Sequence, residues 1–87
     1  MSIERQIVRL QVRIETIAEN ESVPGAAGLG LEDTLAALTV EGRHRVLMLL
    51  ERIRVTSEDP EERAAAEYIR TMAESAWARF PSQPARR

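Results

Sequence analysis

The sequence predicts an all-α fold, a small helical bundle made of an N-terminal amphipathic helix and a C-terminal antiparallel helical hairpin. Two observations support this prediction. The chain is rich in Ala, Leu, Arg and Glu, which favour helices, and only 3% of its 87 residues are aromatic. Apolar residues also recur at helical spacing in three long segments. Because so short a chain buries only a small core, we expect a second copy to cover further apolar surface, so the predicted assembly is a homodimer.

The distribution of Pro and Gly predicts one domain and a tail. Residues 1–80 form the helical domain, with the N-terminal helix at 1–20, a flexible loop at 21–31 and the helical core at 32–80. The Pro- and Gly-rich loop lets the first helix dock at a distance from the next element. The tail at 81–87 has no large apolar side chain, and we expect it to be disordered.

The first helix comes from a segment, QIVRLQVRIETI, that fits two structures. Its β-branched residues alternate with polar ones as in a strand. A helix accounts for more of the apolar residues, because they step by four and three over two and a half heptads, and Ser2 can cap it. The helix is therefore preferred. We predict that its apolar seam is a dimer or partner interface, formed by Ile3, Ile7, Leu10, Ile14 and Ile17.

A row of like charges lies on the same helix. Arg5, Arg9 and Arg13 are four residues apart, which costs an isolated helix about 0.2–0.5 kcal/mol per pair. The second half of the helix is acidic, with Glu15, Glu19 and Glu21. Two antiparallel copies would place the arginine row of each helix against the acidic half of the other. Alternatively, the acidic segment 58–62 of the same chain could compensate the arginine row. The three arginines are thus predicted to make electrostatic contacts with a partner.

The middle of the chain predicts one short and one long helix. The short helix covers about 31–38. The long one starts behind Thr39, and Glu41 with Arg45 supports its first turns as an i,i+4 pair. Met48 and Leu49 widen its apolar stripe almost to the full circumference, which predicts a central helix contacted from more than one side.

The last helix has the clearest boundaries. Asp59 is the predicted N-cap, Pro60 occupies the first helical position, and Glu62 completes a capping box. The apolar period then continues through residues 60–79, and Pro81 stops it. The short link from the middle helix makes the two helices antiparallel neighbours.

The residues do not form a catalytic or metal-binding constellation. The chain has no Cys and one His, and His44 with Glu41 gives a single ExxH motif where a di-iron bundle needs two. One His cannot complete a nucleophilic relay, and the glycines match no phosphate-binding motif. We therefore predict a protein that is not an enzyme and has no cofactor, metal or small-molecule substrate. The absence of Cys and of a long apolar run predicts a cytoplasmic protein without a membrane partner.

The predicted function is a non-enzymatic protein–protein interaction module that acts as a homodimer, as an adaptor, regulator or steric inhibitor of an unidentified protein. At the end of the last helix, Trp77 and Phe80 are candidate aromatic anchors for a partner. All twelve cationic side chains are Arg, which together with abundant Ala is typical of a GC-rich bacterial or phage genome. Small size and the lack of an active site also suit a phage or mobile-element protein that blocks a host complex.

The alternative function is DNA binding by a transcriptional regulator, although the net charge of −2 is low for a dedicated nucleic-acid binder. The segment VRLQVRI resembles the N-terminal strand of ribbon-helix-helix repressors, whose paired strands enter the major groove. The resemblance implies that Arg9, Gln11 and Arg13 contact bases. In that family a helix follows the strand at once, whereas residues 15–22 here lead into a loop. The middle helix, with its Arg residues, is the other candidate for DNA contact.

Overall fold

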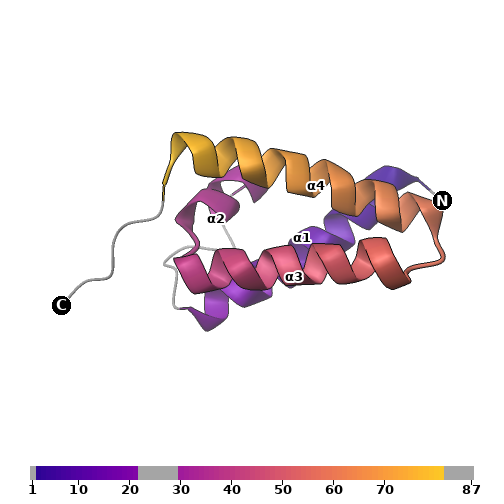
Figure 1. Cartoon of the computed structure of the whole chain (residues 1–87), viewed down its shortest axis with the longest axis horizontal. Helices are drawn as coiled ribbons and strands as arrows, with labels where there is room; N and C mark the ends of the chain where they lie inside the picture. The colour runs from indigo at the N-terminus through magenta and orange to yellow at the C-terminus, as the bar shows by residue number, and fades with distance from the viewer. Residues whose placement is uncertain (1, 22–29, 82–87) are drawn as a thin grey trace.

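Four helices pack around one core in the computed structural model of the chain, which describes residues 2–21 and 30–81 (Figure 1). The helices are α1 (Ile3–Asn20), α2 (Leu31–Ala37), α3 (Val40–Thr56) and α4 (Pro60–Arg79). The described ranges contain no strand, so the predicted all-α class is confirmed and the strand interpretation of the N-terminal segment is wrong. Most of the predicted loop and tail, residues 22–29 and 82–87, lies outside the described residues.

Side chains cap the starts of the three long helices, as the sequence predicts. The Ser2 hydroxyl accepts the Arg5 amide at 3.4 Å, and the Thr39 hydroxyl accepts the Gly42 amide at 3.1 Å. The Asp59 carboxylate accepts the Glu61 amide at 2.9 Å. Each cap satisfies an amide that the first turn of a helix leaves without a backbone partner.

The capping box at the start of α4 differs in one detail from the prediction. The Glu62 carboxylate accepts a hydrogen bond from the Ser57 hydroxyl at 2.5 Å, and that hydroxyl accepts the Asp59 amide at 3.1 Å. Glu62 thus reaches the cap amide through Ser57 and not directly. The relay ties the α3–α4 link to the first turn of α4.

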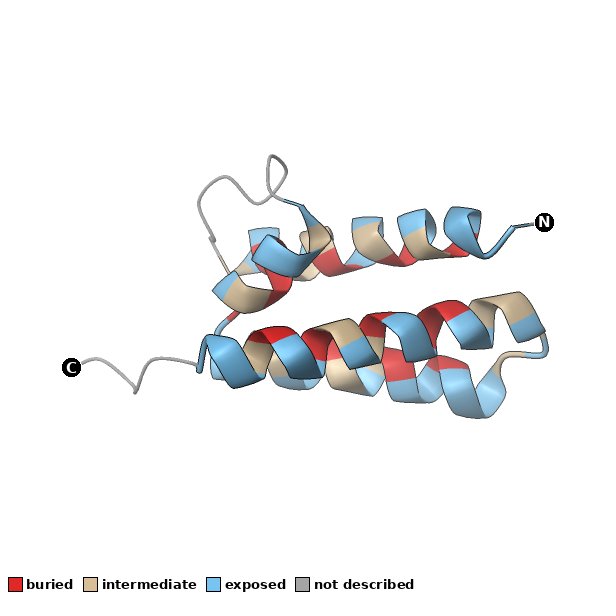
Figure 2. Cartoon of the chain, turned by 90° about the horizontal axis from the view of Figure 1, so that it is seen from above, coloured by how far each residue is buried: buried red, intermediate tan, exposed pale blue. Residues whose placement is uncertain are grey.

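The helices form two layers. α3 and α4 make the predicted antiparallel hairpin, and α1 crosses behind it from the start of α4 to the start of α3 (Figure 1). Figure 2 shows the buried faces of α1 and of the hairpin turned toward each other. α2 packs on α1 and α4 at the end where α4 finishes.

As predicted, α3 is contacted from more than one side, by α4 and by α1, but the helix with the most extensive contacts to the others is α4. The cause is the size of the α4 side chains. Its buried surface consists of Ile69 and four alanines, which let neighbouring backbones approach closely on two sides. The alanines are Ala65, Ala66, Ala73 and Ala76.

The core is built from ridges of residues four apart. α1 buries Leu10, Ile14 and Ala18, and α3 buries Val46 and Leu50. Ridges with this spacing are inclined to the helix axis, and packing them together produces the oblique crossing of α1 over the hairpin (Figure 1). The core therefore explains the direction in which α1 runs.

The buried stripe of α1 differs from the predicted seam at both ends. Leu10 and Ile14 are 2% and 0% exposed inside the single chain, with Ile7 and Ile17 partly buried beside them. Ile3 is 38% exposed, and Gln6 takes the buried position at that end. A strict heptad remains on one face only in a supercoiled helix, whereas a helix crossing obliquely presents an i,i+4 ridge. Most of the predicted seam thus belongs to the core of one chain.

A candidate interaction groove between α1 and α3

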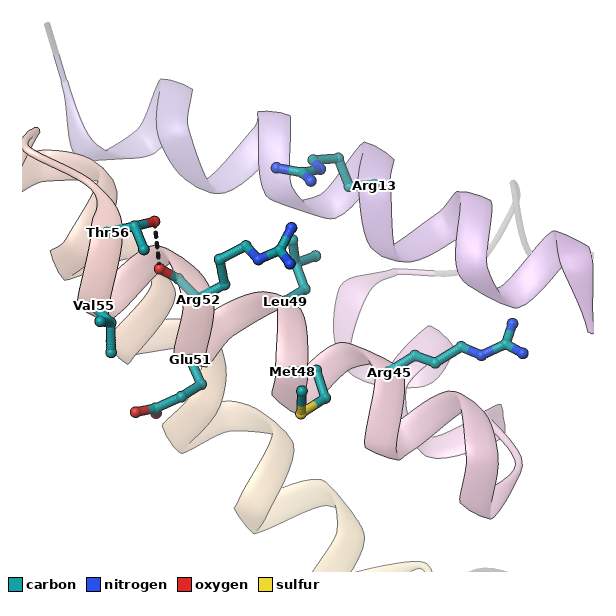
Figure 3. A pocket seen from close by; sticks show the side chains of 8 residues that line it. All are labelled: Arg13, Arg45, Met48, Leu49, Glu51, Arg52, Val55 and Thr56. Carbon is teal, nitrogen blue, oxygen red and sulfur yellow. Dashed lines mark hydrogen bonds between the residues drawn. The ribbon is translucent and has the colours of Figure 1, made fainter.

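An open groove lies between α1 and α3, which both pack on α4 more extensively than on each other. Its volume is about 460 Å³. Figure 3 shows Arg13 on the α1 side and the remaining lining residues on α3. Those that define its chemistry are Arg13, Arg45, Met48, Leu49, Arg52 and Val55.

At the groove, α3 exposes part of the broad apolar stripe that the sequence predicts for this helix. Met48 is 59% exposed and Val55 is 72% exposed, while Leu49 is partly buried. Of the two residues that widen the predicted apolar stripe, Met48 therefore faces solvent. A contiguous exposed apolar strip is a candidate binding site.

Three arginines lie beside this strip, on the side of it that faces α1 (Figure 3). Arg13, Arg45 and Arg52 line the groove, and within residues 2–21 and 30–81 no ion pair involves any of them. Arg45 does not make the predicted pair with Glu41 in that part of the chain. The groove thus combines positive charge with an apolar floor.

The one carboxylate among the lining residues is engaged elsewhere. Glu51 Oε1 lies 2.7 Å from Arg54 Nη1 and 3.7 Å from Arg70 Nη1, on the side where α3 meets α4. Figure 3 shows its carboxylate pointing away from Arg13. Arg70 also pairs with Glu74 at 3.4 Å. Glu51 therefore belongs to an ion-pair network of the hairpin, and it leaves the groove arginines uncompensated.

The predicted arginine row lies on the surface of α1. Arg5, Arg9 and Arg13 are all exposed. Among the described residues, none of the three forms an ion pair with residues 58–62 or with another carboxylate. Of the three, Arg13 lines the groove.

The two candidate aromatic anchors have different surroundings. Trp77 is partly buried against the core, and its Nε1 donates a hydrogen bond to the Leu35 carbonyl at 2.8 Å, which joins α4 to α2. Phe80 is 54% exposed just beyond α4. Trp77 therefore stabilises the fold, and Phe80 has the exposure that a contact with another molecule requires.

Arg43 is one of the middle-helix arginines that the sequence offers as a candidate for DNA contact, and in the structure it organises the same end of the molecule. Its Nη2 donates to the Ala36 and Phe80 carbonyls at 2.9 and 2.8 Å, its Nε donates to the Leu38 carbonyl at 3.2 Å, and its guanidinium lies 5.3 Å from the Trp77 ring centre. Burial lowers the pKa of Arg43 from its usual value, although an arginine stays charged at neutral pH. Sequence offers no signal for this role, because the carbonyls come from two segments, residues 36–38 and Phe80, that only the fold brings together.

Other candidate chemistry is sparse in the described part of the chain. Glu41 and His44 are both exposed at the start of α3. Residues 2–21 and 30–81 contain no group of three or more His, Cys, Asp or Glu side chains arranged to hold a metal ion. In the same ranges, the helices are too short or too polar to cross a membrane.

Comparison of the chain with protein-family models, with curated proteins and with solved structures found no match.

Proposed function

We propose that this protein is a non-enzymatic protein–protein interaction module, an adaptor, regulator or steric inhibitor that binds another protein through the groove between α1 and α3. The observation that carries the proposal is the exposed strip of Met48 and Val55 beside arginines that have no ion-pair partner in the described ranges. Binding at such a patch is favourable when the partner covers its apolar part and neutralises its charged part.

A retention experiment tests this function. The wild-type protein is immobilised and exposed to a lysate of the cells that naturally produce it, in parallel with the double variant Met48→Asp/Val55→Asp. The control Thr71→Asp/Ser75→Asp adds the same two charges to exposed positions of α4. We expect a protein that the wild type and the control retain and the groove variant loses. Retention that is equal on all three, or absent from all three, contradicts the proposal.

We also propose that the module acts as a homodimer, through the outer face of α1. Val8 and Val12 are 57% and 55% exposed there, and Arg5 and Glu19 are exposed on the same face, each seven residues from Val12. An antiparallel pair of α1 helices with Val12 at the two-fold axis would bring Arg5 of each chain to Glu19 of the other. This contact leaves the core seam of each chain intact.

DNA binding is the second candidate function. The observation that favours it is the set of exposed arginines on α1 and α3 that form no ion pair within the described residues, namely Arg5, Arg9, Arg13, Arg45 and Arg52. If they contact phosphates, retention on duplex DNA falls steeply as salt rises, and each Arg→Ala substitution reduces the salt slope by about one. Absence of retention even at low salt excludes this function.

A further inference from the structure

We propose that the groove between α1 and α3 binds an acidic amphipathic helix of a different protein. This inference rests on the proposed function and adds the chemical class of the partner. It follows from the charge, the apolar floor and the helical walls of the groove.

The charge of the groove selects an acidic occupant. Arg13, Arg45 and Arg52 line one space, and their mutual repulsion is relieved when carboxylates enter it. A second copy that presented the same groove across a two-fold axis would place arginines against arginines. The occupant is therefore an acidic segment of another protein.

The apolar floor selects a protein segment over a nucleic acid. Met48, Leu49 and Val55 lie between and beside the arginines on α3. A phosphate backbone has no apolar group to cover them, whereas an amphipathic helix presents Leu or Ile on one face and carboxylates along its edges. Covering the exposed Met48 and Val55 then adds to the electrostatic attraction.

The shape of the groove favours a helix over an extended strand. Both walls are helices, whose backbone amides and carbonyls are already paired, so an incoming strand finds no edge to extend. Arg45 and Arg52 are seven residues apart, about 10.5 Å along α3. A partner helix with carboxylates seven residues apart matches this spacing, and its apolar residues between them contact Met48 and Leu49.

Binding of synthetic peptides tests the inference directly. The probe is a fluorescein-labelled 21-residue helix of three heptads with Leu at the a and d positions and Glu at e and g. One comparison peptide replaces every Glu by Lys, and a second has the composition of the probe in an order without an apolar face. Fluorescence anisotropy at low salt should show binding of the probe at least tenfold tighter than that of either comparison peptide.

Three protein variants locate the binding. Arg45→Gln/Arg52→Gln removes two charges, and Met48→Ser/Val55→Ser removes apolar surface at exposed positions where folding is little affected. Thr71→Glu/Ser75→Glu, on exposed positions of α4, changes the net charge as much as the arginine pair does. We expect both groove variants to weaken probe binding at least tenfold and the α4 control to change it less than twofold, with circular dichroism showing equal helix content.

Each of the following results overturns the inference. If the comparison peptide without an apolar face binds as well as the probe, or if the groove variants bind the probe as the wild type does, the groove does not recognise an acidic helix. If a 20-base-pair DNA duplex binds and loses affinity in the arginine variant but not in the Met48/Val55 variant, the ligand is nucleic acid. Partner retention that depends on the groove, without probe binding, would overturn this inference and leave the proposed function standing.

Discussion

Gly42 shows how one small residue joins two parts of the chain. In the sequence it weakens the first turn of α3, because Gly disfavours helices. In the structure, the Glu21 carboxylate occupies the space where a Gly42 side chain would lie. That carboxylate accepts the Thr39 amide at 3.2 Å and the Thr39 hydroxyl at 2.8 Å. A negative group at a helix N-terminus is favourable, so the residue after α1 stabilises the start of α3.

We predict that Glu21 and Gly42 are energetically coupled. Glu21→Ala should lower the free energy of unfolding by about 1 kcal/mol, because it removes the hydrogen bonds to Thr39. In Gly42→Ala the new methyl group displaces the carboxylate, so the same Glu21→Ala change should then cost less than about 0.5 kcal/mol. Urea denaturation of the wild type, the two single variants and the double variant measures the coupling. Equal costs of Glu21→Ala in both backgrounds would show that the two residues act independently.

Arg43 is the second residue whose role depends on geometry. We predict that Arg43→Lys lowers the free energy of unfolding by about 1–3 kcal/mol, because a single ammonium group cannot reproduce hydrogen bonds to three carbonyls and the stacking on Trp77. Thermal and urea unfolding measure the change. The matched control is Arg9→Lys at an exposed position, expected to stay within about 0.5 kcal/mol of wild type. A stability loss no larger than that of the control would contradict the role.

At the scale of elements, the sequence predicts helix boundaries well where capping chemistry is local. Asp59 and Pro60 define the start of α4, and the predicted range 60–79 is the observed one. Thr39 and Ser2 do the same for α3 and α1. These predictions succeed because a cap and the amide it satisfies are at most a few residues apart.

The candidate site was harder to predict, because exposure depends on contacts between elements. Met48 and Leu49 are apolar in any fold, and periodicity alone cannot show whether a neighbour covers them. The alanine surface of α4 lets α1 and α3 both pack on α4, which leaves the outer side of α3 uncovered. The row of arginines on α1 can be recognised in the sequence. Only the fold shows that Arg13 of this row lines the same groove as Arg45 and Arg52.

Two substitutions in α1 can distinguish packing through the buried i,i+4 ridge from packing through the predicted heptad seam. Ile14→Ala should lower the free energy of unfolding by about 2–4 kcal/mol, because Ile14 is fully buried. Ile3→Ala should cost less than about 1 kcal/mol, because Ile3 is 38% exposed at the helix start. Urea denaturation at two protein concentrations gives both values. Comparable costs for the two substitutions would indicate that the heptad seam, and not the ridge, carries the packing of α1.

For the whole molecule, the two proposed contacts use different surfaces. The groove lies on the side of α1 that carries Arg13, while the dimer contact centres on Val12 and faces outward. Two copies joined through α1 would therefore present two grooves at once. A partner with two acidic helices would then bind more tightly than either groove alone allows, because the second contact is intramolecular.

The dimer contact can be tested by exchanging charges. In the antiparallel arrangement, Arg5 of one chain meets Glu19 of the other, so Arg5→Glu or Glu19→Arg alone places like charges at both ends of the interface. We predict that sedimentation equilibrium gives twice the 9.8 kDa chain mass for the wild type, and that either single variant weakens association at least fivefold. The double variant Arg5→Glu/Glu19→Arg restores opposite charges and should recover the dimer. A wild type that stays monomeric at 0.5 mM, or single variants that associate as the wild type does, would rule out this contact, because no other arrangement of two α1 helices pairs these two positions symmetrically.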